Sequence, residues 1–192
     1  LLEPIGRNTA PAVALAAMIA KNEFNDPLIL VLSADHNFKD NKMFINSIEE
    51  GKFFASHDHL VTFGVLPNYA ATGYGYIESV NPLSKEVNSS RIKSFIEKPD
   101  KLKATQLIKN KHFSWNSGIF LFKASTILKE LALFQPEIIN VCKNSLNKAY
   151  RDLDFLRINK NIFEKCPNIS IDNAVMEKTK NGTVVSLDAG WD

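Results

Sequence analysis

The sequence predicts an α/β fold with a mixed, mainly parallel sheet flanked by helices. Helix-like and strand-like segments alternate along the chain, several strand candidates are unbroken apolar runs, and polar residues follow directly after the first of these runs. Unbroken apolar runs are typical of strands buried on both faces, which occur mainly in parallel sheets. Because no repeat or linker divides the chain, we expect residues 1–192 to form one domain.

The elements follow from periodicity, caps and breakers. An alanine-rich segment preceded by Asn8 and Thr9 predicts the first helix, and Pro136 separates two later ones. The expected helices cover residues 10–20, 43–54, 101–109, 126–134, 137–150 and 173–178. The expected strands cover residues 28–32, 60–66, 74–80, 92–97, 118–122 and 183–187, with a hairpin-like excursion at residues 81–90.

The composition narrows the class of partner. Hydrophobic residues make up 45% and charged residues 23% of the chain, as in soluble globular proteins. The formal net charge is +2, and no segment has a dense run of charges of one sign. The sequence therefore does not predict a surface that binds nucleic acid or a membrane. Cys142 and Cys166 form no CxxC pair, so we expect buried apolar fillers in a reducing compartment. A small molecule or a protein is therefore the expected partner.

Asp35 is the first candidate site residue. It follows the apolar run at residues 28–32, and ligands of open α/β sheets bind beyond the carboxyl ends of strands. A carboxylate there can hold a hard divalent cation. The alternative is a helix-capping aspartate, and position alone leaves both open.

Gly75 lies in a Gly-x-Gly run that lacks the third glycine of a dinucleotide loop, because Glu78 stands in its place and a strand follows. Here a glycine either lets a ligand approach the backbone closely or belongs to an ordinary turn.

Glu97 and Lys98 end another strand before Pro99. A carboxylate suits sugar hydroxyls and an ammonium suits a phosphate, but a solvated ion pair is the commoner outcome.

Asn116, just before an expected strand, can donate to and accept from a hydroxyl, or it can form a simple Asx-turn.

Some motifs are discounted. We expect an exposed loop, rather than a metal site, at His57, Asp58 and His59. The commonest hydrolase, zinc-protease and P-loop motifs do not occur.

Seven short motifs, taken in order, resemble the mannose-1-phosphate guanylyltransferase family, and the resemblance spans the whole chain. They are EPIGRNTAPA at residues 3–12, SADH at 33–36, GYGYI at 73–77, FIEKPD at 95–100, WNSG at 115–118, IDNAVMEK at 171–178 and AGW at 189–191. The first points to the guanylyl branch.

The resemblance implies a Rossmann-like nucleotide-diphospho-sugar transferase fold and a reaction in which GTP and mannose 1-phosphate give GDP-mannose and pyrophosphate with Mg²⁺. By similarity, Asp35 would bind the metal, Lys98 would lie near the sugar phosphate, and both would be catalytic. The expected nucleotide-binding residues are Glu3, Arg7, Asn8 and Thr9. The expected sugar-binding residues are Gly75, Glu97, Asn116 and Asp172. We also expect a cytoplasmic enzyme of polysaccharide biosynthesis that acts on neither nucleic acid nor membrane. Both a monomer and a homo-oligomer stay open.

The ends of the sequence predict a fragment, incomplete on both sides. The chain does not begin with Met, and the family's glycine-rich phosphate loop would lie upstream of Glu3. The family pattern Gly-Trp-x-Asp places Asp192 on the variable position, so we do not assign it a metal role. In bacteria, members of this family often carry a C-terminal isomerase domain of cupin type.

Two alternatives stay open. The first is a related sugar-1-phosphate nucleotidyltransferase with another base or sugar, such as a uridylyl or thymidylyl transferase acting on glucose 1-phosphate. The second is a non-catalytic module that binds nucleotide sugars, because such folds host binders as well as enzymes.

Overall fold

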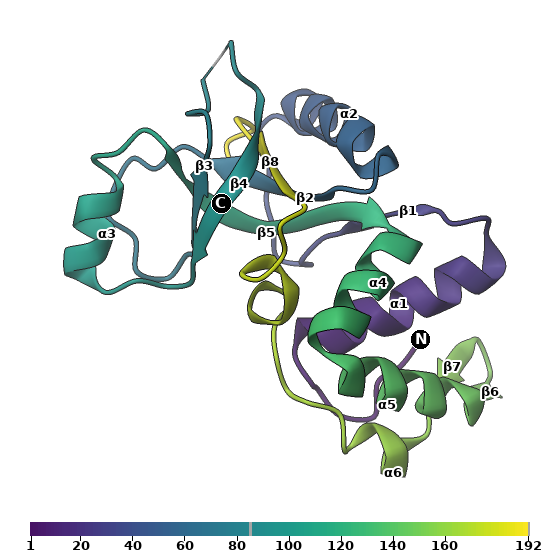
Figure 1. Cartoon of the computed structure of the whole chain (residues 1–192). Helices are drawn as coiled ribbons and strands as arrows, with labels where there is room; N and C mark the ends of the chain where they lie inside the picture. Colours follow the sequence, from purple (N-terminus) through teal and green to yellow (C-terminus); the bar gives the residue numbers. More distant parts are fainter. Residues whose placement is uncertain (85, 192) are drawn as a thin grey trace. The chain divides into compact units, whose positions relative to one another are not determined.

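The computed structural model describes residues 1–84 and 86–191, which group into two compact units (Figure 1). The first unit comprises Leu1–Pro27 and Ala124–Lys178, and the second comprises Leu28–Lys123 and Thr179–Asp192. Each unit is therefore assembled from segments far apart in the sequence. Within the described residues, no helix is both long and apolar enough to cross a lipid bilayer.

The first unit is mainly helical. Its elements are α1 (Thr9–Glu23), α4 (Ala124–Phe134), α5 (Pro136–Asn147), the strands β6 (Tyr150–Asp152) and β7 (Phe155–Arg157), α6 (Lys160–Phe163) and the π-helix η1 (Asp172–Met176). α1 packs on α4 and α5 through small buried residues, including Ala10, Ala14 and Ala17, which let helices approach closely. The β6–β7 hairpin was not expected from the sequence. The helix expected over residues 137–150 corresponds to α5 and ends earlier, at Asn147.

The second unit contains a six-stranded sheet. Its strands are β1 (Leu28–Val31), β2 (Leu60–Val65), β3 (Tyr76–Ser79), β4 (Ser89–Ile96), β5 (Phe113–Lys123) and β8 (Gly182–Ser186), in the order β1-β5-β2-β8-β4-β3. β3 also pairs with β5, so the pairings from β5 through β2, β8, β4 and β3 return to β5. The helices of this unit are α2 (Asn41–Ser56) and α3 (Lys101–Leu107).

The expectation of a mainly parallel sheet is wrong, although the α/β class is confirmed. Among the described residues of the six-stranded sheet, only β2 and β8 pair in parallel, and the other five pairings are antiparallel. The long strand β5 runs against β1, β2 and β3. The apolar run at residues 119–122 of β5 is buried, so it reports burial and not strand direction. β1, expected to be buried on both faces, is only half-buried at all four positions.

Two helices cover apolar parts of this unit. α2 contributes Ala55 and the partly buried Phe44 and Ile48 to a core that includes Phe63 and Leu121. α3 contributes Ala104 and Leu107 to a second cluster with Tyr76, Phe113 and Trp115. Both helices have an aspartate as N-cap. The carboxylates of Asp40 and Asp100 each accept a hydrogen bond from the backbone N–H three residues later.

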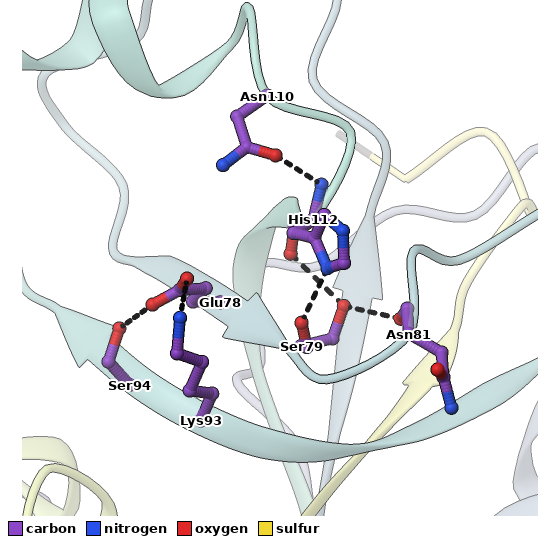
Figure 2. A network of polar contacts seen from close by, with 7 residues as sticks. All are labelled: Glu78, Ser79, Asn81, Lys93, Ser94, Asn110 and His112. Carbon is purple, nitrogen blue, oxygen red and sulfur yellow. Dashed lines mark hydrogen bonds and ion pairs between the residues drawn. The ribbon is translucent and has the colours of Figure 1, made fainter.

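A polar network fixes β3 between its two neighbours (Figure 2). Toward β4, the Glu78 carboxylate accepts from Lys93 Nζ at 2.7 Å and from Ser94 Oγ at 2.8 Å. Toward β5, His112 Nδ1 lies 2.9 Å from the Ser79 carbonyl oxygen, so this nitrogen carries the proton, because a carbonyl can only accept. The position of β3 also determines that of Gly75, which directly precedes it.

Candidate functional site

The predicted nucleotide-binding residues lie at the start of α1, in the first unit. Asn8 is the N-cap, and its side chain accepts from the Thr9 amide at 2.9 Å. Its backbone has φ 65° and ψ −168°, a conformation that is essentially restricted to glycine. Such strain persists only where the surrounding structure enforces it, and it is concentrated at functional positions. A functional role for this loop stays a prediction.

The same loop is held to the segment that leads into η1. Thr9 Oγ1 accepts from the Ile171 amide at 2.8 Å, and the Ala10 amide donates to Ile169 O at 3.2 Å. Asp172, predicted to bind the sugar, is the next residue and begins η1. The first unit therefore brings Thr9 and Asp172 together, and Thr9 has a structural contact that the sequence did not reveal.

Glu3 and Arg7 carry buried polar atoms. Among the described residues, Oε1 of Glu3 and Nε of Arg7 have no hydrogen-bond partner. Burial raises the pKa of the Glu3 carboxyl above its ordinary value. The other end of the Arg7 guanidinium donates to the Glu164 carbonyl oxygen. Unsatisfied buried groups are rare in folded proteins, and those with no structural explanation are often found at functional sites.

Asp35 lies in an exposed turn shortly after β1, in the second unit. The chain beyond this turn is bound to the C-terminal segment: the Lys39 and Asp40 amides both donate to Ala189 O at 3.0 Å, and Phe38 forms a β-bridge with Trp191. No group of three His, Cys, Asp or Glu side chains in residues 1–84 and 86–191 could hold a metal ion. Asp192 lies outside the described residues.

Gly75, Glu97 and Asn116 come together in the second unit. The backbone N–H of Asn116 donates to Gly75 O at 2.8 Å. A Cβ built on Gly75 would lie 2.6 Å from Glu97 Oε2 and 3.2 Å from Phe95 Cε1. The carboxylate thus occupies the space that any other residue at position 75 would need. The close contact at Gly75 is made by a side chain of the protein itself, and the approach of a ligand to this glycine stays a prediction.

Lys98 extends from the same strand end. Its ammonium lies 3.4 Å from Glu97 Oε1, and its side chain is 62% exposed. Its φ of 40° lies in the left-handed region, which is unusual for a residue other than glycine. An exposed pair of this kind adds little stability. The ammonium is therefore available to an anionic ligand at small energetic cost.

The motif that contains Asn116 lies inside β5 and not before a strand, as the sequence analysis expected. β5 begins at Phe113 and is bulged here: Thr62 pairs with Phe120 and Gly64 with Asn116, so residues 117–119 lie opposite Phe63 alone. Bulges next to functional sites redirect side chains. Asn116 Oδ1 accepts from Thr62 Oγ1 at 2.9 Å, and more weakly from the Gly118 amide at 3.3 Å.

A continuous row of ring contacts, the aromatic row, connects these segments of the second unit. In order, its members are Phe44, Phe38, His36, Trp191, Tyr74, Trp115 and Tyr69, with successive ring centroids 4.1, 6.3, 5.8, 5.2, 5.4 and 4.8 Å apart. Sequence reasoning missed this row, although His36, Tyr74 and Trp115 directly adjoin Asp35, Gly75 and Asn116. The row shows that these three predicted site residues belong to one region of the unit.

The residues discounted from the sequence have structural partners. His57 Nδ1 contacts Phe53 O, Asp58 pairs with Lys123 at 2.9 Å, and His59 Nδ1 lies 2.7 Å from Thr183 Oγ1. Burial is the main cause that lowers the pKa of His59. Cys142 and Cys166 are both buried, as expected of apolar fillers.

A separate cavity of about 660 Å³ lies in the second unit, beside α2 and the end of β8. Its lining includes Met43, Glu50, Leu66 and Asp188 and none of the predicted site residues. The candidate site is therefore defined by the contacts of Gly75, Glu97 and Asn116 and by the aromatic row, and not by this cavity.

Comparison with known proteins shows the family of the chain. The nucleotidyl transferase family model matches residues 1–191, and the chain belongs to this family. It is 46% identical over 193 residues to a mannose-1-phosphate guanylyltransferase of Salmonella muenchen, covering 100% of this chain and 40% of that protein. An alginate biosynthesis protein of Pseudomonas syringae pv. tomato is 46% identical over 191 residues, with 100% and 40% covered.

A crystal structure of a mannose-6-phosphate isomerase from Helicobacter pylori superimposes with a TM-score of 0.88 at 33% identity, covering 100% of this chain and 72% of that one. The chain thus spans about two fifths of the length of the curated relatives above. The family resemblance read from the seven motifs is confirmed.

Proposed function

We propose that the protein containing this chain transfers a guanylyl group from GTP to mannose 1-phosphate and releases pyrophosphate. The observation that carries the proposal is the grouping of Gly75, Glu97 and Asn116 in a chain 46% identical to a mannose-1-phosphate guanylyltransferase. A carboxylate that follows β4 and an amide on β5, two strands that both pair with β3, are suited to recognising the hydroxyls of a sugar.

The chemistry needs no covalent enzyme intermediate. The attacking phosphate oxygen has to be aligned with the phosphorus and the leaving pyrophosphate, while negative charge is balanced. Glu97 and Asn116 would orient the sugar, and the exposed ammonium of Lys98 would balance charge on its phosphate. Asp172 is assigned to the sugar by family resemblance.

The nucleotide is assigned to Glu3, Arg7, Asn8 and Thr9. The buried polar atoms of Glu3 and Arg7 and the strained backbone of Asn8 support this assignment. The cationic guanidinium of Arg7 suits a polyphosphate, and the carboxylate of Glu3 suits N–H groups of a base.

Mg²⁺ is proposed as the cofactor. Proteins usually hold this ion through one or two carboxylates together with water and substrate phosphates, so the exposed carboxylate of Asp35 fits as a single protein ligand. When bound, the ion would neutralise phosphate charge. Asp35 would hold it at the end of β1, and the contacts of residues 38–40 with residues 189–191 would fix this turn.

The test uses the full-length protein and measures pyrophosphate release. We expect release that needs GTP, mannose 1-phosphate and Mg²⁺ together. UTP and dTTP, each with mannose 1-phosphate or glucose 1-phosphate, serve as competitors. Preference for UTP would contradict the guanylyl assignment and favour the related transferase. Binding of GDP-mannose by calorimetry without turnover would favour a non-catalytic module.

The cellular setting is proposed on the same grounds. The similarity to an alginate biosynthesis protein supports a role in supplying GDP-mannose for polysaccharide synthesis. We propose a cytoplasmic location, where GTP is available, and light scattering of the full-length protein would show whether it is a homo-oligomer. Fractionation that placed the protein outside the cytoplasm would contradict this setting.

A further inference from the structure

Thr62 is fully buried on β2, opposite the bulge of β5. Its hydroxyl donates to Asn116 Oδ1 at 2.9 Å and lies 3.0 Å from Ile119 O. Both acceptors belong to the bulged segment, where the ladder between β2 and β5 is interrupted. Because a hydroxyl carries a single proton, it is assigned to the shorter contact, the one to Asn116 Oδ1.

These contacts determine which way the side-chain amide of Asn116 faces. Two donors, the Thr62 hydroxyl and the Gly118 amide, converge on Oδ1. Exchanging Oδ1 and Nδ2 would place the NH₂ group against the Gly118 N–H, so that two donors would meet. The Nδ2 end is therefore turned away from the bulge.

Gly118 completes this arrangement. Its φ of 73° lies in the left-handed region, although a Cβ at this position would meet no atom within 4 Å. The backbone conformation, and not lack of space, requires glycine here. This conformation directs the Gly118 amide to Asn116 Oδ1.

We infer that Thr62 is a positioning residue, whose hydroxyl fixes the orientation of the Asn116 amide for binding the sugar phosphate. The inference rests on the proposed function, because the sugar role of Asn116 belongs to it. Thr62 itself is buried beneath Asn116 and touches no substrate in this assignment.

The test compares Thr62→Val with Thr62→Ser in the full-length protein. Valine keeps the shape of threonine and removes the donor, whereas serine keeps the donor. Since one hydrogen bond is lost, we expect KM for mannose 1-phosphate to rise about 3- to 10-fold in Thr62→Val. We expect KM for GTP to stay within about 2-fold, and Thr62→Ser to restore the KM for mannose 1-phosphate.

Thr183→Val is the matched control. Thr183 is a buried strand threonine of the same unit, and its hydroxyl contacts His59 and not Asn116. It should lose thermal stability as Thr62→Val does, with KM unchanged. Equal rises in KM for both substrates in Thr62→Val, or a similar rise in Thr183→Val, would reduce Thr62 to a structural residue and overturn the inference.

A second measurement does not depend on turnover. In protein labelled with ¹⁵N-asparagine, the side-chain NH₂ signals of Asn116 can be assigned by their loss in Asn116→Asp. We expect them to shift or broaden in Thr62→Val and to keep their position in Thr62→Ser. Unchanged signals in Thr62→Val would overturn the inference. Wild-type protein without mannose 1-phosphate-dependent turnover would refute the proposed function, while the NMR result would still decide the role of Thr62.

Discussion

The carboxylate of Glu97 lies where a side chain on residue 75 would have to be, 2.6 Å from the Cβ position of Gly75. Gly75→Ala would therefore displace Glu97 by several tenths of an ångström or tilt the strand end. Because small misplacements of a binding group are costly, we expect kcat/KM for mannose 1-phosphate to fall about 10- to 100-fold.

Gly73→Ala is the control for this prediction, since a Cβ at Gly73 would meet no atom within 4 Å. Its kcat/KM should stay within about 2-fold of the wild type, because neither packing nor backbone conformation opposes the change. Equal activities of the two variants in steady-state assays would show that the contact between Gly75 and Glu97 has no role in sugar binding.

Asp35→Asn should reduce pyrophosphate release by about 100-fold or more, since the neutral amide is a poor ligand for a hard cation. The Mg²⁺ concentration for half-maximal activity should rise as well. Asp154→Asn, in the exposed turn of the β6–β7 hairpin, should change neither quantity. A variant at Asp35 with normal rate and normal Mg²⁺ dependence would remove this residue from the metal site.

Asn8→Gly should stabilise the protein and weaken its binding of GTP. Glycine adopts the backbone conformation of Asn8 without strain, so we expect the free energy of unfolding to rise by about 1 kcal/mol. Asn159→Gly is the matched control, because Asn159 caps α6 from an ordinary φ of −68° and has no strain to release. Urea denaturation and GTP calorimetry measure the two effects. A lower stability of Asn8→Gly than of the wild type would contradict the release of backbone strain at this position.

Glu78→Gln should change the acid stability of the protein. Hydrogen bonds from Lys93 and then Ser94 hold the pKa of Glu78 below its ordinary value. The stabilisation by the carboxylate is therefore present above the pKa of the unfolded chain and is lost as the pH falls through that of the folded state. Urea midpoints should differ between wild type and variant at pH 7 and converge in acid.

Glu49→Gln provides the comparison, because Glu49 pairs with Lys52 on the exposed surface of α2. It should change the midpoint less at pH 7, since exposed pairs add little stability. A Glu78→Gln midpoint that tracks the wild type at every pH would contradict the role assigned to the network of Figure 2.

Most elements could be predicted from local pattern, because α1 has helix-forming alanines after possible capping residues and α2 has apolar residues at helical spacing. Strand direction could not. β5 contains an apolar run at residues 119–122, and such a run does not reveal whether the neighbouring strands are parallel or antiparallel. The β6–β7 hairpin was missed because it is short and exposed.

The candidate site was predicted as a set of residues, and the contacts within it were not. The grouping of Gly75, Glu97 and Asn116 depends on the pairing of β3 with both β4 and β5, which no local pattern encodes. The role of Thr62 depends on a bulge that places residues 117–119 opposite one residue. A buried threonine in an apolar strand shows no such role in the sequence.

The aromatic row also has a spectroscopic consequence. Both tryptophans of the 192 residues, Trp115 and Trp191, are members of it, and Tyr74 lies between them. Their emission therefore originates in the region that contains Asp35, Gly75 and Asn116, with none arising elsewhere in these residues. Intrinsic fluorescence of this part of the protein reports on the surroundings of the candidate site without any attached dye.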